Sequence, residues 1–304
     1  MSNRKPRWTD LDDVARRKAI NELRVQRPQL EVVLKRMNLM REGHREGREA
    51  TCMTLTGEPG VGKSEFLKLY ALANPVVEER TGDGVLRRRP VVYVELPSAA
   101  TVLTASDAIM RVMLGDNAPS GRAVRDGLME RQLKVQRVEI LILDEFQHVG
   151  EKGAEKTRAQ TADFIKGITK RTRIPIVMAG MPVIDTLIED NKQLDTITPY
   201  RIMIPAYAFA ANEEKEGFRS YLAKVDAALP FDQPSKLAAN ALSTKLFLAS
   251  EGNLRILMRI ISEAGRLAIE EHACSIFERH LHEAYEAEAL ALDNPFEPPI
   301  DEAA

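Results

Sequence analysis

The chain has 304 residues, of which 44% are hydrophobic and 29% charged, so it is long enough for one large or two modest domains with a buried core. No apolar run is long enough to span a bilayer and the start of the chain has no hydrophobic signal core, so we expect a cytoplasmic protein without a membrane partner. Cys52 and Cys274 have no nearby cysteine partner, which argues against a disulfide framework and against a zinc site.

The net charge of −2 is unevenly distributed. Residues 1–50 hold thirteen Lys or Arg against eight Asp or Glu, whereas from Glu270 onward ten acidic residues stand against one arginine. This asymmetry is typical of a basic region that contacts nucleic acid or a protein, followed by an acidic tail. Two solvated helical faces would give the same pattern.

Two helices are expected before the first strand. Thr9 and Asp12 form a plausible capping box for a helix that ends near Leu23, and Pro28 is placed to begin a second. The apolar residues 52–55 then predict a buried strand.

An unbroken G-x-x-x-x-G-K-[ST] phosphate-binding loop follows this strand at residues 57–64. Its glycines allow backbone N–H groups to point at phosphate oxygens, while Lys63 supplies a charge for the β- and γ-phosphates and Ser64 a hydroxyl ligand for Mg²⁺. A helix predicted from residue 65 would direct its N-terminus at the same anion. We therefore expect ATP to be bound by Gly57, Glu58, Pro59, Gly60, Val61, Gly62, Lys63, Ser64 and Glu65.

Residues 74–90 indicate a loop, residues 91–95 a second strand, and residues 105–114 and 122–136 two helices. The next strand, 138–143, is apolar enough to be buried on both faces of a parallel sheet, and it ends at Asp144 and Glu145. Because open α/β sheets bind ligands at the carboxyl ends of their strands, we assign Asp144 to Mg²⁺. We assign Glu145 to polarising the water that attacks ATP.

A helix at 159–172 and strands at 174–179 and 200–204 continue this alternation, whereas from residue 212 onward the pattern predicts helices alone. The fold class expected is therefore α/β, with a five-stranded parallel sheet followed by an all-helical lid. The expected segments are a basic helical region (1–44), the α/β core (45–207), the helical lid (208–290) and an acidic, disordered tail (291–304).

This order of motifs resembles the P-loop AAA+ ATPases. The Gly-Asn-Leu-Arg run at 252–255 looks like their sensor-2 motif, in which Arg255 would reach the γ-phosphate. More specifically, residues 91–97, 140–148, 174–180, 190–194 and 204–205 resemble the TniB/TnsC-type transposition ATPases, relatives of the Mu B target-selection protein. The resemblance implies an ATP-dependent homo-oligomer, a ring or helical filament, that binds duplex DNA and works with a transposase and a target-selection protein.

Two positions depart from that family. Met181 stands where the family usually has a polar sensor-1 residue, and no Arg-Phe pair follows Leu194 to supply an arginine finger in trans. Arg201 could take the finger's role if the chain is displaced, although Thr198 lies nearer the family position. Both departures predict slow hydrolysis with ATP binding retained.

DNA is expected to be bound through its phosphates, because aromatic residues are too few, at 5%, for a base-stacking platform. Two other functions share the same nucleotide site. A signalling NTPase switch would bind ATP without responding to DNA, and a helicase loader would bind a hexameric helicase and prefer single strands. The candidate DNA contacts are Ser98, Thr101, Arg122, Arg125, Lys152 and Lys156.

Overall fold

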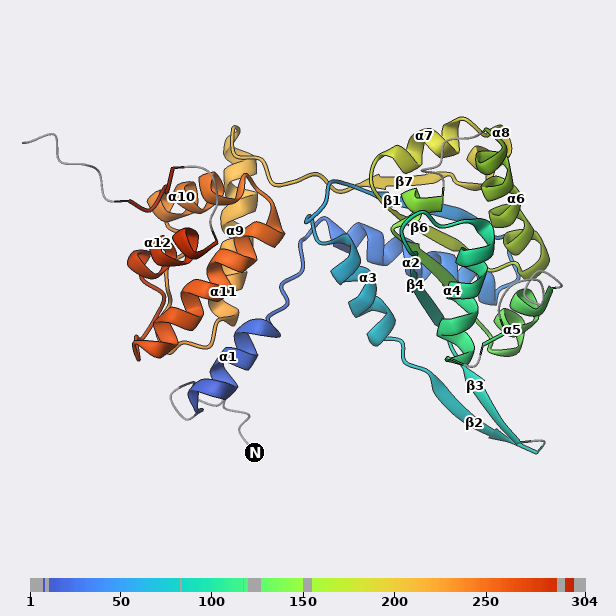
Figure 1. Ribbon diagram of the computed structural model, residues 1–304, viewed down its shortest axis with the longest axis horizontal. Helices are drawn as coiled ribbons and strands as arrows, with labels where there is room; N and C mark the ends of the chain where they lie inside the picture. The colour runs from blue at the N-terminus through green and yellow to red at the C-terminus, as the bar shows by residue number, and fades with distance from the viewer. Residues whose placement is uncertain are drawn as a thin grey trace, which may run out of the picture. The chain divides into compact units, whose positions relative to one another are not determined.

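The computed structural model describes residues 8, 11–82, 84–116, 118–119, 127–149, 155–288 and 293–297 (Figure 1). The chain divides into two compact units, which we call the core unit (28–205) and the helical unit (1–27 and 206–304). The expected segment 1–44 is thus divided between the two units, with its first helix in the helical unit and its second in the core unit. None of the described helices is long and apolar enough to cross a bilayer.

The core unit is built on a five-stranded parallel sheet, as predicted, and the structure gives the strand order β4-β5-β6-β1-β7. Because β6 lies between β1 and β5, the phosphate loop after β1 and Asp144 at the end of β5 emerge at the same edge of the sheet, on either side of β6. The strands are β1 (Cys52–Thr56), β4 (Val91–Glu95), β5 (Ile140–Asp144), β6 (Ile176–Gly180) and β7 (Tyr200–Met203).

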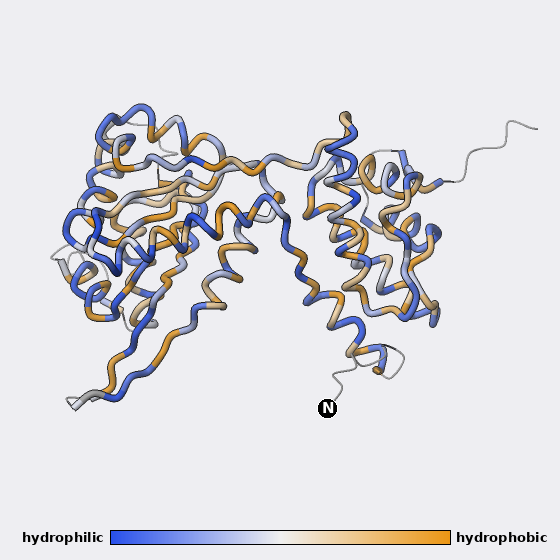
Figure 2. The backbone as a smooth tube through the Cα atoms, turned by 180° about the vertical axis from the view of Figure 1, so that it is seen from behind, coloured by the Kyte–Doolittle hydropathy of each residue, from blue (hydrophilic) through white to orange (hydrophobic). Residues whose placement is uncertain are grey.

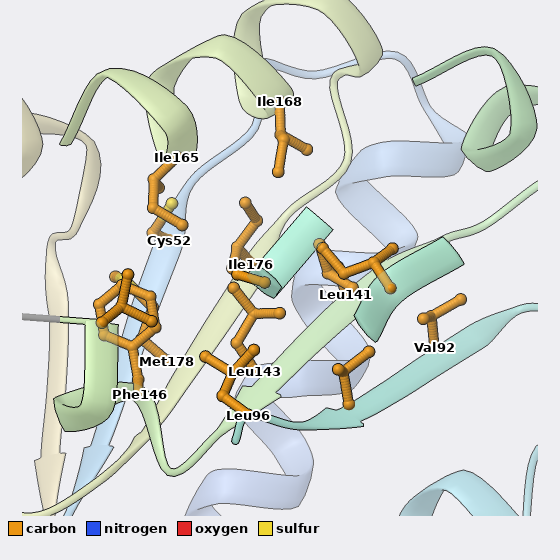
Figure 3. Close-up of a cluster of buried hydrophobic side chains, with 14 of the residues drawn as sticks. Cys52, Val92, Leu96, Leu141, Leu143, Phe146, Ile165, Ile168, Ile176 and Met178 are labelled. Carbon is orange, nitrogen blue, oxygen red and sulfur yellow. The ribbon is translucent and has the colours of Figure 1, made fainter. Parts of the chain in front are cut away.

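Helices cover the sheet on both faces, which explains why its inner strands are apolar throughout. On one face, Ile165 and Ile168 of α6 (Glu155–Thr172) belong to the same buried cluster as Leu141 and Ile176 of the sheet (Figure 3). This cluster also takes in α4 (Val102–Leu114), α5 (Met129–Val135), α7 (Val183–Glu189) and α8 (Lys192–Ile197). Helices α2 (Leu30–Arg45) and α3 (Lys63–Leu72) contact the opposite face of the sheet.

The loop predicted for residues 74–90 is wrong, because this segment forms an antiparallel hairpin of β2 (Val77–Thr81) and β3 (Gly84–Arg88). Glu78 faces Arg87 across the pair, with 3.0 Å between Oε1 and Nε, and opposite charges on facing residues stabilise a hairpin. The hairpin extends away from the five-stranded sheet (Figure 1). At its base, Arg88 lies 2.9 Å from the buried Glu139.

The helical unit consists of α1 (Asp13–Asn21), α9 (Asn212–Ala228), α10 (Asn240–Ser250), α11 (Leu254–Glu270) and α12 (Glu278–Ala287). Helix α1 joins it because Ile20 packs against Gly265 of α11, where a Cβ would lie only 2.7 Å from Ile20 Cδ1. Hydrophilic and hydrophobic residues alternate along these helices (Figure 2), as expected of helices with one buried face. The cap of α1 is Asp12, which accepts from the Ala15 N–H at 2.7 Å; Thr9 lies outside the described residues.

The uneven charge is partly neutralised within each unit. Several of the arginines near the start of the chain bind acidic side chains, and so do cations that face the acidic C-terminal region. The charges of these residues are therefore paired within the chain, and the Arg41–Glu139 pair is buried rather than part of a solvated face. The pairs include Arg41 and Arg45 with Glu139, Arg17 with Glu270, Lys245 with Glu278 and Arg259 with Glu288.

Candidate functional site

The loop after β1 has the backbone that a phosphate site requires. Gly57, Gly60 and Gly62 have φ angles of 156°, 84° and 97°, and Gly62 is the left-handed N-cap of α3. A Cβ at Gly57 would lie 2.3 Å from the carbonyl oxygen of Ile204, so this position has no room for a side chain. The loop amides and the N-terminus of α3 therefore present positive partial charge at the end of β1.

Lys63 begins α3 and is buried against this loop. Its ammonium donates to the carbonyl oxygens of Gly57 at 2.7 Å and Glu58 at 3.0 Å. A charged phosphate oxygen is a stronger partner for an ammonium than a neutral carbonyl. The ammonium is thus held where a phosphate bound in the loop would replace the carbonyl oxygens as its partner. The next residue of the helix, Ser64, is half-buried.

Asp144 is buried at the end of β5, with 1% of its surface exposed. Its Oδ2 accepts from the Tyr93 hydroxyl at 2.8 Å and its Oδ1 from the Glu145 N–H at 3.0 Å. Burial, with the adjacent Asp144 charge, raises the pKa of Tyr93, so the phenol remains a donor. The sequence analysis missed Tyr93, because only the pairing of β4 with β5 brings it to Asp144.

A magnesium site of three or more protein carboxylates is not present among the residues that the structure describes. Magnesium needs few protein ligands when a nucleotide supplies phosphate oxygens. The buried carboxylate of Asp144 and the hydroxyl of Ser64 are of the kind that such an arrangement uses, and they would hold the ion together with the phosphates.

Glu145 has φ of 56°, a left-handed conformation that is uncommon for a residue with a Cβ. Its Oε2 accepts a hydrogen bond from Nε2 of Gln147, a residue of the short helix η3 (Phe146–Val149). Oε1 of Gln147 accepts in turn from the N–H of Met181 at 3.1 Å. Met181 therefore contributes its backbone, and Gln147 is a second site residue that the sequence analysis did not assign.

The predicted arginines occupy different surroundings. Arg201 forms ion pairs with Glu189 at 2.6 Å and with Asp195, both in its own core unit. Thr198 is buried and donates to the Leu194 carbonyl oxygen at 2.8 Å, so it is a core residue rather than a group presented to a neighbour. Arg255 is exposed in the helical unit, and none of the described residues forms an ion pair with it.

The Gly-Asn-Leu-Arg run has a clear local role in starting α11. A Cβ at Gly252 would lie 2.0 Å from the carbonyl oxygen of Tyr207, so glycine is required there. The Asn253 side chain caps the helix by accepting from the N–H of Arg255 at 3.0 Å. Leu254 is buried, which leaves Arg255 as the residue of this run that faces solvent.

Of the candidate DNA contacts, Ser98 and Thr101 are exposed after β4. Thr101 also caps α4 by accepting from the Thr104 N–H at 3.2 Å. Arg122, Arg125 and Lys152 lie outside the described residues, as does the side chain of Lys156.

A family profile described as Bacterial TniB protein matches residues 16–196, more than half of the chain. The chain belongs to the TniB family. This confirms the resemblance seen in the sequence. No curated protein sequence matches this TniB-family chain.

Several solved structures have a fold similar to that of the TniB-family chain. The ORC2 protein of Aeropyrum pernix, in ADPNP-ADP complexes, has a TM-score of 0.62 at 17% identity, covering 89% of this chain and 69% of that one. Cdc6p from Pyrobaculum aerophilum has a TM-score of 0.61 at 16% identity, covering 92% and 72%. The A. pernix ORC1 protein in complex with DNA has 0.61 at 16%, covering 90% and 69%. The fold is that of the P-loop AAA+ ATPases, with a helical C-terminal part.

Proposed function

We propose that this TniB-family protein is a cytoplasmic, ATP-dependent regulator of DNA transposition. It oligomerises on duplex target DNA and recruits or activates the transposase, with slow Mg-ATP hydrolysis as the timer. The observation that carries the proposal is the phosphate loop beside the Asp144-Glu145 pair at one sheet edge, in a chain that the TniB profile matches. The structural likeness to an ORC1 protein in complex with DNA supports the DNA-binding part.

In the proposed reaction, the loop amides bind the ATP phosphates and the Lys63 ammonium moves from the loop carbonyls to the β- and γ-phosphates. Bound Mg²⁺ would neutralise charge on the phosphate oxygens. Asp144, oriented by the Tyr93 hydroxyl, and Ser64 would hold that ion. Glu145 accepts the proton of the attacking water.

Two arginines supply the remaining proposed contacts. Arg255 is exposed and forms no ion pair with a described residue. It binds the γ-phosphate and distinguishes ATP from ADP. Arg201 acts as the finger for a neighbouring subunit only after leaving Glu189 and Asp195. The need to break two ion pairs is consistent with slow turnover.

The experiment that tests this function is negative-stain microscopy with a non-hydrolysable ATP analogue, with and without duplex DNA. Filaments or stacked rings that need both ligands, and that Lys63→Ala abolishes, support the proposal. Oligomers that form identically without DNA would instead favour a signalling switch. A preference for single strands, with capture of a hexameric helicase, would favour a loader.

A further inference from the structure

The Gln147 side chain links the carboxylate of Glu145 to the end of strand β6. Its amide nitrogen donates to Glu145 Oε2, and its amide oxygen accepts from the Met181 N–H at 3.1 Å. Gln147 is itself buried, with 7% of its surface exposed. Both ends of a buried amide are thus satisfied, one of them by a carboxylate.

The Met181 N–H determines which way the Gln147 amide faces. A backbone N–H is only a donor, so it requires the amide oxygen on its side and leaves the NH₂ group for Glu145. The reversed amide would place its oxygen against the carboxylate and its NH₂ against the N–H, which loses both bonds. The end of β6 therefore sets a hydrogen-bond donor in front of Glu145.

Gly180 provides the space for this arrangement. Its φ is 153°, and a Cβ at this position would lie 2.0 Å from Gln147 Oε1. Any larger residue at position 180 would displace the glutamine amide or the strand end. Gly180 and Gln147 are therefore sterically coupled, although they are distant in the sequence.

We infer that Gln147 is a positioning residue for Glu145, and that β6 acts on the proposed general base through it. This inference rests on the proposed function of Glu145. The bond from Gln147 uses one carboxylate oxygen, so the other can accept the proton of the attacking water. It also restrains a glutamate whose backbone is in an uncommon left-handed conformation.

A double-mutant cycle tests the inference. Gln147→Met keeps the length of the side chain but removes the donor, and we expect kcat for ATP hydrolysis to fall about 10- to 100-fold, because misplacing a catalytic group costs rate. KM and the affinity for a fluorescent ATP analogue should change less than about twofold. The Gln147→Met/Glu145→Gln double variant should hydrolyse ATP no more slowly than Glu145→Gln alone.

Two further variants separate positioning from general damage. Gly180→Ala leaves Gln147 in the chain but crowds its amide, and it should lower kcat like Gln147→Met. Gln193→Met changes an exposed glutamine whose amide accepts from Lys166, and it should behave as the parent.

Each remaining outcome decides either against the inference alone or against both the proposed role of Glu145 and the inference. If Glu145→Gln turns over like the parent, the proposed base is wrong and the inference falls with it. If Glu145→Gln stalls but Gln147→Met does not, only the inference is overturned. It is overturned as well if the two losses add in the double variant, or if Gln147→Met and Gly180→Ala lose nucleotide affinity or folding along with kcat.

Discussion

The Tyr93 hydroxyl donates a hydrogen bond of 2.8 Å to Oδ2 of Asp144, from strand β4 to the neighbouring strand β5. Asp144 is buried and accepts a second bond, through Oδ1, from the Glu145 N–H. The carboxylate is therefore held by two donors within the core unit. Its orientation depends on Tyr93, a residue of the neighbouring strand.

Tyr93→Phe should raise the magnesium concentration needed for half-maximal ATP hydrolysis about tenfold, because removing a hydrogen bond from a carboxylate that binds a metal lowers the metal affinity. The measurement is ATP hydrolysis against magnesium concentration, with nucleotide binding in the absence of metal as a reference that should not change. Tyr200→Phe is the matched control, since the Tyr200 ring contacts Arg36 and belongs to another strand. An unchanged magnesium requirement would show that Tyr93 does not orient the metal ligand.

Gly57→Ala should abolish ATP binding, because the new methyl group would lie 2.3 Å from the Ile204 carbonyl oxygen and force the loop to move. Titration with a fluorescent ATP analogue measures the loss, which we expect to exceed about 100-fold, because each lost hydrogen bond to a charged phosphate is worth about 1.5–3 kcal/mol and about 1.4 kcal/mol is a factor of ten in affinity. Gly82→Ala, where a Cβ meets nothing within 4 Å, should bind as the parent. Parental affinity in Gly57→Ala would mean that the loop can shift without cost.

Glu139→Gln should destabilise the core unit by about 3–5 kcal/mol, because it removes the shared partner of three arginines and leaves the buried Arg41 uncompensated. Chemical denaturation measures the free energy of unfolding. Glu78→Gln removes an exposed partner of Arg87 instead, and it should cost less than about 1 kcal/mol. Equal losses in the two variants would contradict the buried cluster's role.

Acid should remove the stabilisation that Glu139 provides. Burial alone would raise the pKa of Glu139, but the hydrogen bonds from Arg45, Arg41 and Arg88 outweigh it and lower the pKa from 4.5 to about 2. A carboxyl with a lowered folded-state pKa stabilises the protein above its unfolded pKa, and this is lost as pH falls toward the folded value. As the pH falls from about 4.5 to about 2, the free energy of unfolding of the parent should therefore decrease by up to about 3 kcal/mol more than that of Glu139→Gln. This follows because one pKa unit corresponds to about 1.4 kcal/mol. Parallel pH curves would disprove the assignment.

Arg255→Ala should reduce the preference for ATP over ADP, because it removes the proposed contact with the γ-phosphate, which ADP lacks. The substitution breaks no ion pair among the described residues, since Arg255 is exposed and forms none there. Arg266→Ala is the control on the same helix, since Arg266 binds Glu263 and Glu270. Competition between the two nucleotides for a fluorescent analogue gives the ratio. A ratio that Arg255→Ala leaves at the parental value would make Arg255 a surface residue.

Local patterns in the sequence were sufficient for the α/β fold with its five-stranded sheet and for the family. The strands of a parallel sheet are buried on both faces, so residues 52–55 and 140–143 are largely apolar segments that can be recognised as strands without knowledge of their neighbours. The phosphate loop is likewise continuous in the chain, and its glycines are required by its own backbone. The hairpin of β2 and β3 was missed because cross-strand charge pairs, rather than apolar alternation, hold its strands together.

The partners of the site residues were decided only by the tertiary structure. Tyr93 reaches Asp144 because β4 pairs with β5, and Gln147 reaches Met181 because β6 lies beside β5. Helix α1 packs on α11 although Ile20 and Gly265 are 245 positions apart in the sequence. Side-chain contacts of this kind depend on strand register and helix packing, which bring together residues that no local pattern relates.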